Sequence, residues 1–215
     1  MTHLSAVFAA VLLAGSLVSA TSAQTFDSAY TDLDLKKCKH TDSKEPEDYG
    51  FWTCRGHAGV TVRVSGADQR TTVSFGPKAA DQLAASQTFP SFNSVDKVKV
   101  EWRLVKEGEQ KSTPFATIVR WQVKLDEDTK ASRGRVLAVT RLGDTVCHVG
   151  YVDALANKNA NALARELAEK HARTFDCEKD KRIILGVKGD SIAGMAEQIE
   201  SEEEEKKNPP PAEKQ

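Results

Sequence analysis

The sequence predicts an α+β fold in which an antiparallel sheet of about six strands, or an open barrel, is covered by a C-terminal helix. Three observations predict it: hydrophobic and polar residues alternate along several short segments, hydrophobic residues later recur at helical spacing, and four cysteines can form two intrachain disulfides. The chain has 215 residues, of which 40% are hydrophobic and 28% charged. This composition is typical of a globular protein and excludes collagen-like and multi-span membrane proteins.

The alternating segments predict strands that pair as hairpins, each with one solvated face for the most part. Three pairs are expected: residues 59–65 with 70–75, 97–106 with 115–125, and 135–142 with 145–152. In the second pair, Val98, Val100 and Trp102 share one face, and charged residues lie between them. Residues 182–187 are expected to add a last strand, and the alanine-rich residues 78–86 a short helix.

A longer helix is predicted after the last hairpin, because small and hydrophobic residues recur there at steps of three and four. Asn157 or Asn159 is placed to cap it, and it is expected to reach Phe175. Its apolar residues are Ala160, Leu163, Ala164, Leu167, Ala168, His171 and Phe175. The apolar stripe would cover the sheet.

The four cysteines predict disulfides, because an even set in an exported chain is typical of an oxidising compartment. Three connectivities are possible. We predict Cys38–Cys54 and Cys147–Cys177, because each closes a short loop. A zinc site would need closely spaced pairs such as Cys-x-x-Cys, which the spacings of 16, 93 and 30 residues do not provide. We therefore predict neither a metal nor a cofactor.

Residues 1–23 are expected to be a cleavable export signal. No charged side chain lies between residues 4 and 20, and the small residues Thr21 and Ala23 take the −3 and −1 positions before a cut at Gln24. A retained anchor is the alternative, but Gly15 and several serines interrupt a run that is already near the lower length limit for a span. The predicted location is periplasmic, with no transmembrane segment after cleavage.

Residues 197–215 are expected to form a disordered acidic and proline-rich tail, because they offer few apolar side chains to bury. Seven acidic and three basic residues give this tail a net charge of −4 within a chain of −1. Residues 24–196, expected to be a single α+β domain, are then only mildly basic, at +3. This charge argues against a nucleic-acid partner.

His148, Tyr151 and Asp153 are the most enzyme-like cluster, at the end of a predicted strand. Such residues could transfer protons in a small hydrolase. Strand alternation predicts that His148 and Tyr151 point to opposite faces, which favours packing roles for both and a capping role for Asp153. The sequence contains no Gly-x-Ser-x-Gly, His-Glu-x-x-His or nucleotide-binding glycine motif. We predict no catalytic residue.

Two regions are candidates for binding a partner. Trp52, Arg55 and His57 lie in a predicted loop beside Cys54, and loops commonly carry recognition residues. Basic residues on the polar strand faces could form a surface for an anionic partner, although Glu101 lies among them and cross-strand ion pairs are the favoured alternative. These basic residues are Arg63, Lys97, Lys99, Arg103, Arg120, Lys124, Arg135 and Arg141.

Several segments together resemble a family of uncharacterised exported proteins of Gram-negative bacteria. They are YTDL at 30–33, WTC at 52–54, EWR at 101–103, PFATI at 114–118, CHVGYVDA at 147–154 and NANALAR at 159–165. The resemblance covers most of residues 28–178 and implies a periplasmic location, with no activity attached. Residues 52–56, WTCRG, also resemble the aromatic-x-Cys-x-x-Gly opening of periplasmic lysozyme inhibitors, which implies lysozyme inhibition as an alternative.

The expected function is that of a non-enzymatic periplasmic protein that binds an envelope protein or ligand. Export, two disulfides and the lack of catalytic motifs favour this hypothesis. The alternatives are a lysozyme-inhibitor-like protein and a small hydrolase that uses His148, Tyr151 and Asp153.

Overall fold

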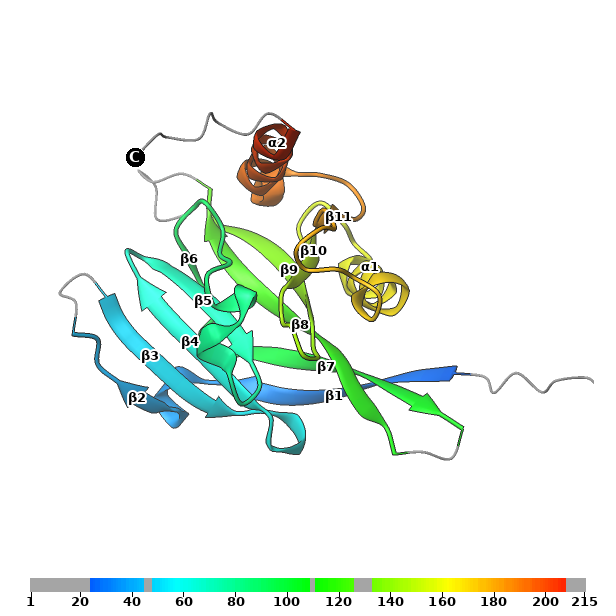
Figure 1. The fold of residues 1–215 in the computed structure, drawn as a ribbon. Helices are drawn as coiled ribbons and strands as arrows, with labels where there is room; N and C mark the ends of the chain where they lie inside the picture. The colour runs from blue at the N-terminus through cyan, green and yellow to red at the C-terminus, as the bar shows by residue number, and fades with distance from the viewer. Residues whose placement is uncertain (1–23, 45–47, 109–110, 126–132, 208–215) are drawn as a thin grey trace, which may run out of the picture.

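A computed structural model describes residues 24–44, 48–108, 111–125 and 133–207. The predicted export signal, residues 1–23, lies outside the described residues, as does the end of the predicted tail, residues 208–215. The α+β fold class is confirmed, and so are both disulfides. The strands are divided between two sheets (Figure 1).

A seven-stranded sheet forms the centre of the molecule, in the order β1-β7-β8-β9-β10-β11, with β6 paired to β8. All pairs are antiparallel except β10 with β11, which is parallel. The predicted pairs 97–106 with 115–125 and 135–142 with 145–152 are confirmed here. The bounds are β1 Gln24–Leu33, β6 Asn93–Ser94, β7 Val98–Glu107, β8 Thr113–Lys124, β9 Arg133–Arg141, β10 His148–Asp153 and β11 Ile183–Ile184.

A four-stranded antiparallel sheet packs over one face of the first, in the order β2-β3-β4-β5. The predicted hairpin of β4 and β5 is confirmed, and its turn at Asp68 and Gln69 has positive φ values of 45° and 58°. Such paired left-handed residues match the twist of a two-residue hairpin turn. The bounds are β2 Lys39–Thr41, β3 Asp48–Arg55, β4 Thr61–Ala67 and β5 Arg70–Phe75.

The main hydrophobic core lies between the two sheets. Val64 and Phe75 of the small sheet contribute to it, and Trp102 and Trp121 of the large sheet are at most 1% exposed. The rings of Phe75 and Trp102 meet edge to face, with centroids 5.6 Å apart. Aromatic side chains of this size bury enough area to dominate the packing energy of a domain.

A second core lies on the other face of the large sheet, where helix α1 (Ala160–Leu167) covers β9 and β10. The α-helix is shorter than predicted, because the chain continues from Ala168 to Ala172 as a π-helical turn. The central strands are therefore buried on both faces, and all six residues of β10 are buried. The expected solvated face is wrong for these strands, since helix and small sheet cover opposite sides.

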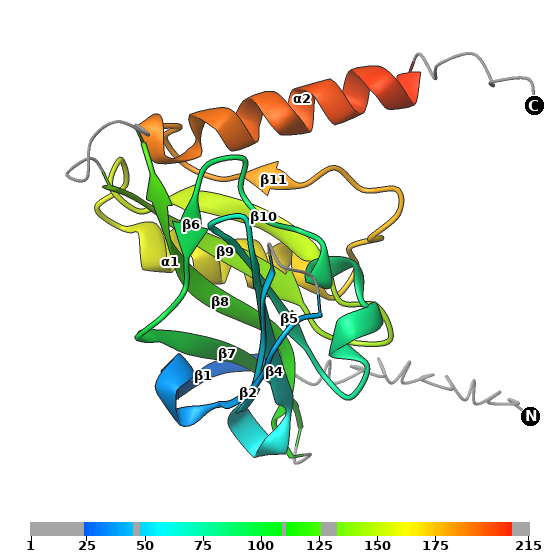
Figure 2. The same ribbon diagram turned by 90° about the vertical axis from the view of Figure 1, so that its left-hand side faces the viewer.

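Helix α2 (Ala193–Lys207) lies across one end of the two sheets (Figure 2). The prediction that a disordered tail begins at residue 197 is wrong. Ile192, Met195 and Ile199, spaced three and four residues apart, form a helical stripe that is at most 5% exposed within the main core. Burial of this stripe offsets the entropy of ordering the acidic segment.

Short helical turns connect the main elements. The helix predicted at residues 78–86 is two such turns, at Ala79–Asp81 and Leu83–Ala85. The others are Leu35–Lys37, His57–Gly59 and Asp190–Ile192.

The disulfides connect segments that are 16 and 30 residues apart in the sequence. Cys38–Cys54 ties the segment before β2 to β3, and Cys147–Cys177 ties the residue before β10 to the loop that follows α1. On the loop-entropy relation, closing loops with separations of 16 and 30 residues stabilises the fold by about 3 kcal/mol each.

Replacing Ile199 with alanine should lower the free energy of unfolding by about 2–4 kcal/mol, because it removes a buried aliphatic side chain from the docking face of α2. Urea denaturation measures the change. Glu204→Ala is the matched control on the exposed side of the same helix and should change stability by less than about 0.5 kcal/mol. Equal effects of the two substitutions would show that α2 does not dock through Ile199.

Candidate functional site

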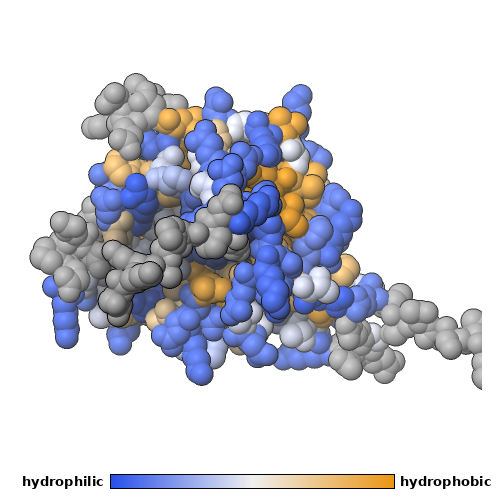
Figure 3. Space-filling model, turned by 45° about the horizontal axis from the view of Figure 1, so that its top comes forward, coloured by the Kyte–Doolittle hydropathy of each residue, from blue (hydrophilic) through white to orange (hydrophobic). Residues whose placement is uncertain are grey.

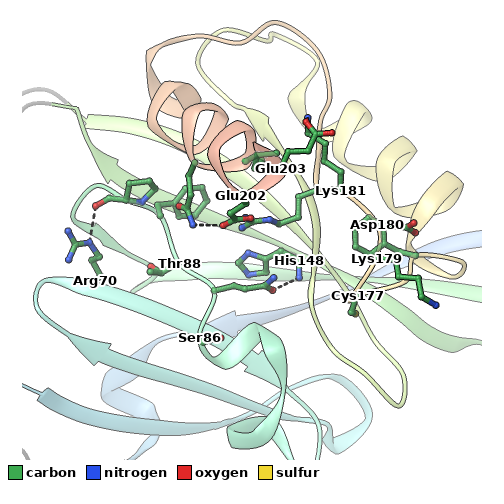
Figure 4. A pocket seen from close by; sticks show the side chains of 17 residues that line it. Arg70, Ser86, Thr88, His148, Cys177, Lys179, Asp180, Lys181, Glu202 and Glu203 are labelled. Carbon is green, nitrogen blue, oxygen red and sulfur yellow. Dashed lines mark hydrogen bonds and ion pairs between the residues drawn. The ribbon is translucent and has the colours of Figure 1, made fainter. Parts of the chain in front are cut away.

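A groove of about 690 Å³ lies beneath α2, between the segment that precedes β6 and the loop that follows α1. His148 is at its base, and Glu202 and Glu203 of α2 are on one wall (Figure 4). The described lining residues are Arg70, Ser86, Gln87, Thr88, Phe89, Pro90, His148, Phe175, Cys177, Lys179, Asp180, Lys181, Arg182, Gln198, Ile199, Glu202 and Glu203. The volume is in the range of sites for small molecules.

An irregularity in β10 brings His148 and Tyr151 together. His148 pairs with Thr140 of β9, but Gly150 pairs with Val139, so the strand holds one extra residue at this point. The bulge reverses the alternation, and His148 Nδ1 lies 2.9 Å from the Tyr151 hydroxyl. The prediction that these side chains point to opposite faces is therefore wrong.

The contact continues from Tyr151 to helix α2. The Arg182 guanidinium donates a hydrogen bond to the Tyr151 hydroxyl at 3.2 Å and forms an ion pair with Glu202. Because arginine only donates, the tyrosine oxygen accepts there, and among the described contacts His148 Nδ1 is the acceptor to which the Tyr151 hydroxyl can donate its hydrogen. The chain of contacts His148–Tyr151–Arg182–Glu202, which we call the groove relay, thus assigns the imidazole hydrogen to Nε2.

Burial sets the protonation of the groove relay. Removal from water lowers the pKa of His148 to about 3, with a smaller contribution from the nearby positive charge of Arg182. Burial also raises the pKa of Tyr151 to about 12. Both groups are therefore neutral at pH 7, and His148 is a hydrogen-bonding group rather than a charge.

The charged side chains around the groove are largely paired with each other or with neighbours. Arg182 binds Glu202, and Lys181 binds Glu203. Arg70 pairs with Asp68, and Lys179 with Asp176 at 3.1 Å. On the face that α2 crosses, hydrophilic residues predominate and hydrophobic residues form separate patches (Figure 3). The groove therefore offers neutral polar groups to a ligand, because most of the charged side chains around it are already in ion pairs.

Asp153 does not join His148 and Tyr151. Its Oδ1 accepts hydrogen bonds from the backbone N–H groups of Leu155 and Ala156, and its Oδ2 accepts one from Ser191. These bonds confirm the capping role that the sequence predicts for Asp153. They also occupy the carboxylate that a hydrolase would need to orient its histidine.

The predicted binding residues Trp52, Arg55 and His57 do not form one site. All but His57 lie on β3 rather than in a loop, and strand alternation places Trp52 and Arg55 on opposite faces. The ring of Trp52 packs against that of His40 in a tilted arrangement, with centroids 4.6 Å apart, and the ring centroids of His57 and Trp102 are 6.2 Å apart. Arg55 is exposed.

The eight basic residues predicted on the polar strand faces do not form one surface. Arg103 is 5% exposed and pairs with Glu101 and Glu169, and Arg141 donates to the backbone carbonyl of Phe175. Arg63 lies over the ring of Phe51, and Lys124 over that of Phe92. The remaining four, Lys97, Lys99, Arg120 and Arg135, line one pocket beside α1.

Over the described ranges, no group of three or more His, Cys, Asp or Glu residues is arranged to hold a metal ion. Within the same residues, no helix has both the length and the apolar character needed to cross a membrane. Comparison of the chain with protein families, curated proteins and solved structures found no match.

Three groove residues, Gln87, Arg182 and Glu202, are not among the predicted site residues. Arg182 and Glu202 are twenty positions apart and meet only because α2 is ordered. The signal for that helix was the spacing of Ile192, Met195 and Ile199. Gln87, whose Oε1 accepts a hydrogen bond from the His148 backbone at 2.7 Å, lies in a segment without regular structure and gives no sequence signal.

The buried His148 should make stability depend on pH. The pKa of His148 is lower in the folded state than the ordinary value of 6.5, so the unfolded chain binds more protons below pH 6.5. The contribution of His148 to the free energy of unfolding is fully present above pH 6.5 and should fall as the pH decreases toward 3. His148→Gln should remove about 2–3 kcal/mol of the loss between pH 7 and pH 4.

Urea denaturation at each pH measures this effect. His171→Gln, which changes an exposed histidine on the π-helical turn, should keep the slope of the unmodified protein. A His148→Gln protein with the same slope as the His171→Gln protein would contradict the assignment.

Proposed function

We propose that this protein is a non-enzymatic binding protein of the periplasm, and that the groove beneath α2 is its binding site. The observation that carries the proposal is the buried, neutral His148 at the base of a groove whose charged side chains are compensated. The two disulfides support an oxidising compartment. Cleavage before Gln24 would leave every described strand intact.

Binding is favoured over catalysis because the groove lacks an activated nucleophile or base among its described residues. Ser86 donates its hydroxyl hydrogen to the carbonyl of Leu83, and Thr88 donates to that of Thr71. A histidine with a pKa of about 3 is a weak base at neutral pH. The hydrolase hypothesis therefore has no support from the arrangement of His148, Tyr151 and Asp153.

The groove suits a small neutral or zwitterionic ligand with hydrogen-bond acceptors and an apolar side. His148 Nε2 and the side-chain amide of Gln87 are available as neutral donors, since Nδ1 and Oε1 are engaged elsewhere. Phe89, Phe175 and Ile199 supply apolar surface. A sugar or a short peptide combines these properties, and both classes occur in the cell envelope.

Lysozyme inhibition is less well supported by the described contacts. The segment that resembles those inhibitors is mostly strand β3, and its side chains Trp52 and Arg55 face opposite sides of the sheet. Excess purified protein should therefore leave the rate of lysozyme-driven lysis unchanged in a turbidity assay. Protection of the cells would instead place the function at this segment.

The groove is tested with N-acetylglucosamine, glucose and dialanine as probes. At least one should raise the melting temperature and quench tryptophan fluorescence, because Trp121 lies next to His148, with ring centroids 6.3 Å apart. His148→Phe should weaken that binding about tenfold, since it keeps a ring but removes the Nε2 donor.

His57→Phe is the matched control, because it makes the same replacement in the segment that the sequence favours. It should leave the affinity unchanged. If His57→Phe weakens binding and His148→Phe does not, the site is at residues 52–57. If none of the three probes binds, the groove is not a site for this ligand class.

A further inference from the structure

We propose that a second pocket, on the α1 side of the large sheet, binds a phosphoryl group carried on a small polar molecule. The pocket has a volume of about 520 Å³ and lies over β7, β8 and β9 beside the start of α1. We call it the arginine pocket. Its lining residues are Tyr30, Lys97, Val98, Lys99, Glu101, Ile118, Arg120, Gln122, Arg135, Leu137, Asn161 and Arg165.

The arginine pocket lies on the opposite side of the sheet from the groove. Ile118 and Leu137, which line it, belong to the core beneath α1, whereas Trp121 and Tyr151 belong to the core between the sheets. Because strand side chains alternate, Arg120 and Arg135 point to the α1 side with their neighbours Ile118 and Leu137. The inference is therefore independent of the proposed groove function.

Five cationic side chains and one carboxylate line this pocket. The carboxylate, Glu101, is already engaged: Arg165 binds both its oxygens, at 2.6 and 3.4 Å, and Ser28 donates to it at 2.6 Å. The buried Arg103 also lies 3.7 Å from it. Glu101 is thus not available to neutralise the remaining cations.

Arg120 and Arg135 form the centre of the unbalanced charge. Arg120 is opposite Leu137, and Arg135 is opposite Gln122, so the two arginines are diagonal neighbours on adjacent strands. The side chain of Arg120 makes one hydrogen bond within the described residues, to Asn161 Oδ1 at 3.0 Å, and neither arginine forms an ion pair there. Lys99 pairs with Asp32, whereas Lys97 has no such partner in the same part of the chain.

The pair is electrostatically unfavourable when the pocket is empty of anions. Partial burial, and after it the charge of Arg135, lowers the pKa of the Arg120 guanidinium. An anion placed between the two guanidinium groups would remove this repulsion and accept several hydrogen bonds. Arginine forks match the oxygens of a phosphate group in geometry and charge.

The rest of the lining indicates that the ligand is larger than inorganic phosphate. Ile118 and Leu137 form an apolar floor, and the ring of Tyr30, 50% exposed, stands at the rim. The Tyr30 hydroxyl is held by a hydrogen bond of 3.0 Å from Arg165. Gln122 and Asn161 add neutral polar groups for a hydroxylated carrier. A sugar phosphate and a phospholipid headgroup share this chemistry.

Titration calorimetry with glucose 1-phosphate tests whether the ligand is a soluble sugar phosphate. Glucose and chloride at equal ionic strength are the reference ligands. The unmodified protein should bind the phosphate ester at the arginine pocket and should show no Arg120-dependent binding of glucose or chloride. Arg120→Gln and Arg135→Gln should each weaken binding about tenfold or more, because each removes charge-assisted hydrogen bonds. Arg55→Gln, which removes an exposed arginine on β3, is the matched control and should retain the affinity.

Co-sedimentation with vesicles tests the lipid source. Phosphatidylglycerol vesicles, compared with neutral phosphatidylcholine vesicles, should bind the protein in an Arg120-dependent manner if a headgroup is the ligand. Binding in either assay that is lost in Arg120→Gln and kept in Arg55→Gln supports the proposal and identifies the source. Lack of binding in both assays, or an equal loss in Arg55→Gln, would overturn it. His148→Phe should leave this binding unchanged.

Discussion

The groove relay, His148–Tyr151–Arg182–Glu202, is the interaction on which the candidate site depends. It begins with one extra residue in β10, which turns two side chains three positions apart to the same face. Arg182 then joins that strand to α2 through its ion pair with Glu202. Without the bulge, His148 and Tyr151 would point to opposite faces of the strand and could not contact each other.

Coverage of the large sheet on both faces explains which of its charged side chains are paired. Polar groups on the central strands are shielded from water, so they must be satisfied by neighbours. Glu101, Arg103, Glu169 and Arg165 pair in a cluster that joins β7 to α1 and the turn that follows it, with only the Nε of Arg103 left without a partner in the described part of this cluster. Near the start of α1, the sheet is less covered, and there Arg120 and Arg135 remain uncompensated within the described residues. The same covering helix therefore satisfies one set of charges and leaves another facing a pocket.

The sequence was sufficient for features that depend on local pattern. Alternation in residues 97–106 and 115–125 predicted β7 and β8, and short loop closure predicted both disulfides. It was not sufficient for features created by packing. The edge strand β1 carries mostly polar or exposed side chains and has no alternating apolar signal. The bulge in β10 does have a local marker, Gly150, since a glycine inside a strand is typical of a bulge or a close backbone approach. Alternation alone does not take this glycine into account, so it gave the wrong face for His148.

The same distinction applies to the acidic C-terminal segment. Its composition predicts disorder when each residue is considered alone, because glutamates and lysines bury little apolar area. Three hydrophobic residues, Ile192, Met195 and Ile199, are nevertheless enough to dock a helix when the end of a two-sheet core is open to receive them. The glutamates that follow form ion pairs with Lys181 and Arg182, which lie next to the docked helix.

The disulfide Cys147–Cys177 relates the predicted compartment to the candidate site. Cys147 directly precedes His148, and Cys177 follows Phe175, so the bond fixes the two sides of the groove against each other. The loop after Cys177 carries Lys181 and Arg182 to α2. Because a disulfide persists only where oxidation is maintained, the groove has its full covalent support outside the cytoplasm. The shape of the groove thus depends on a bond that is typical of an oxidising compartment.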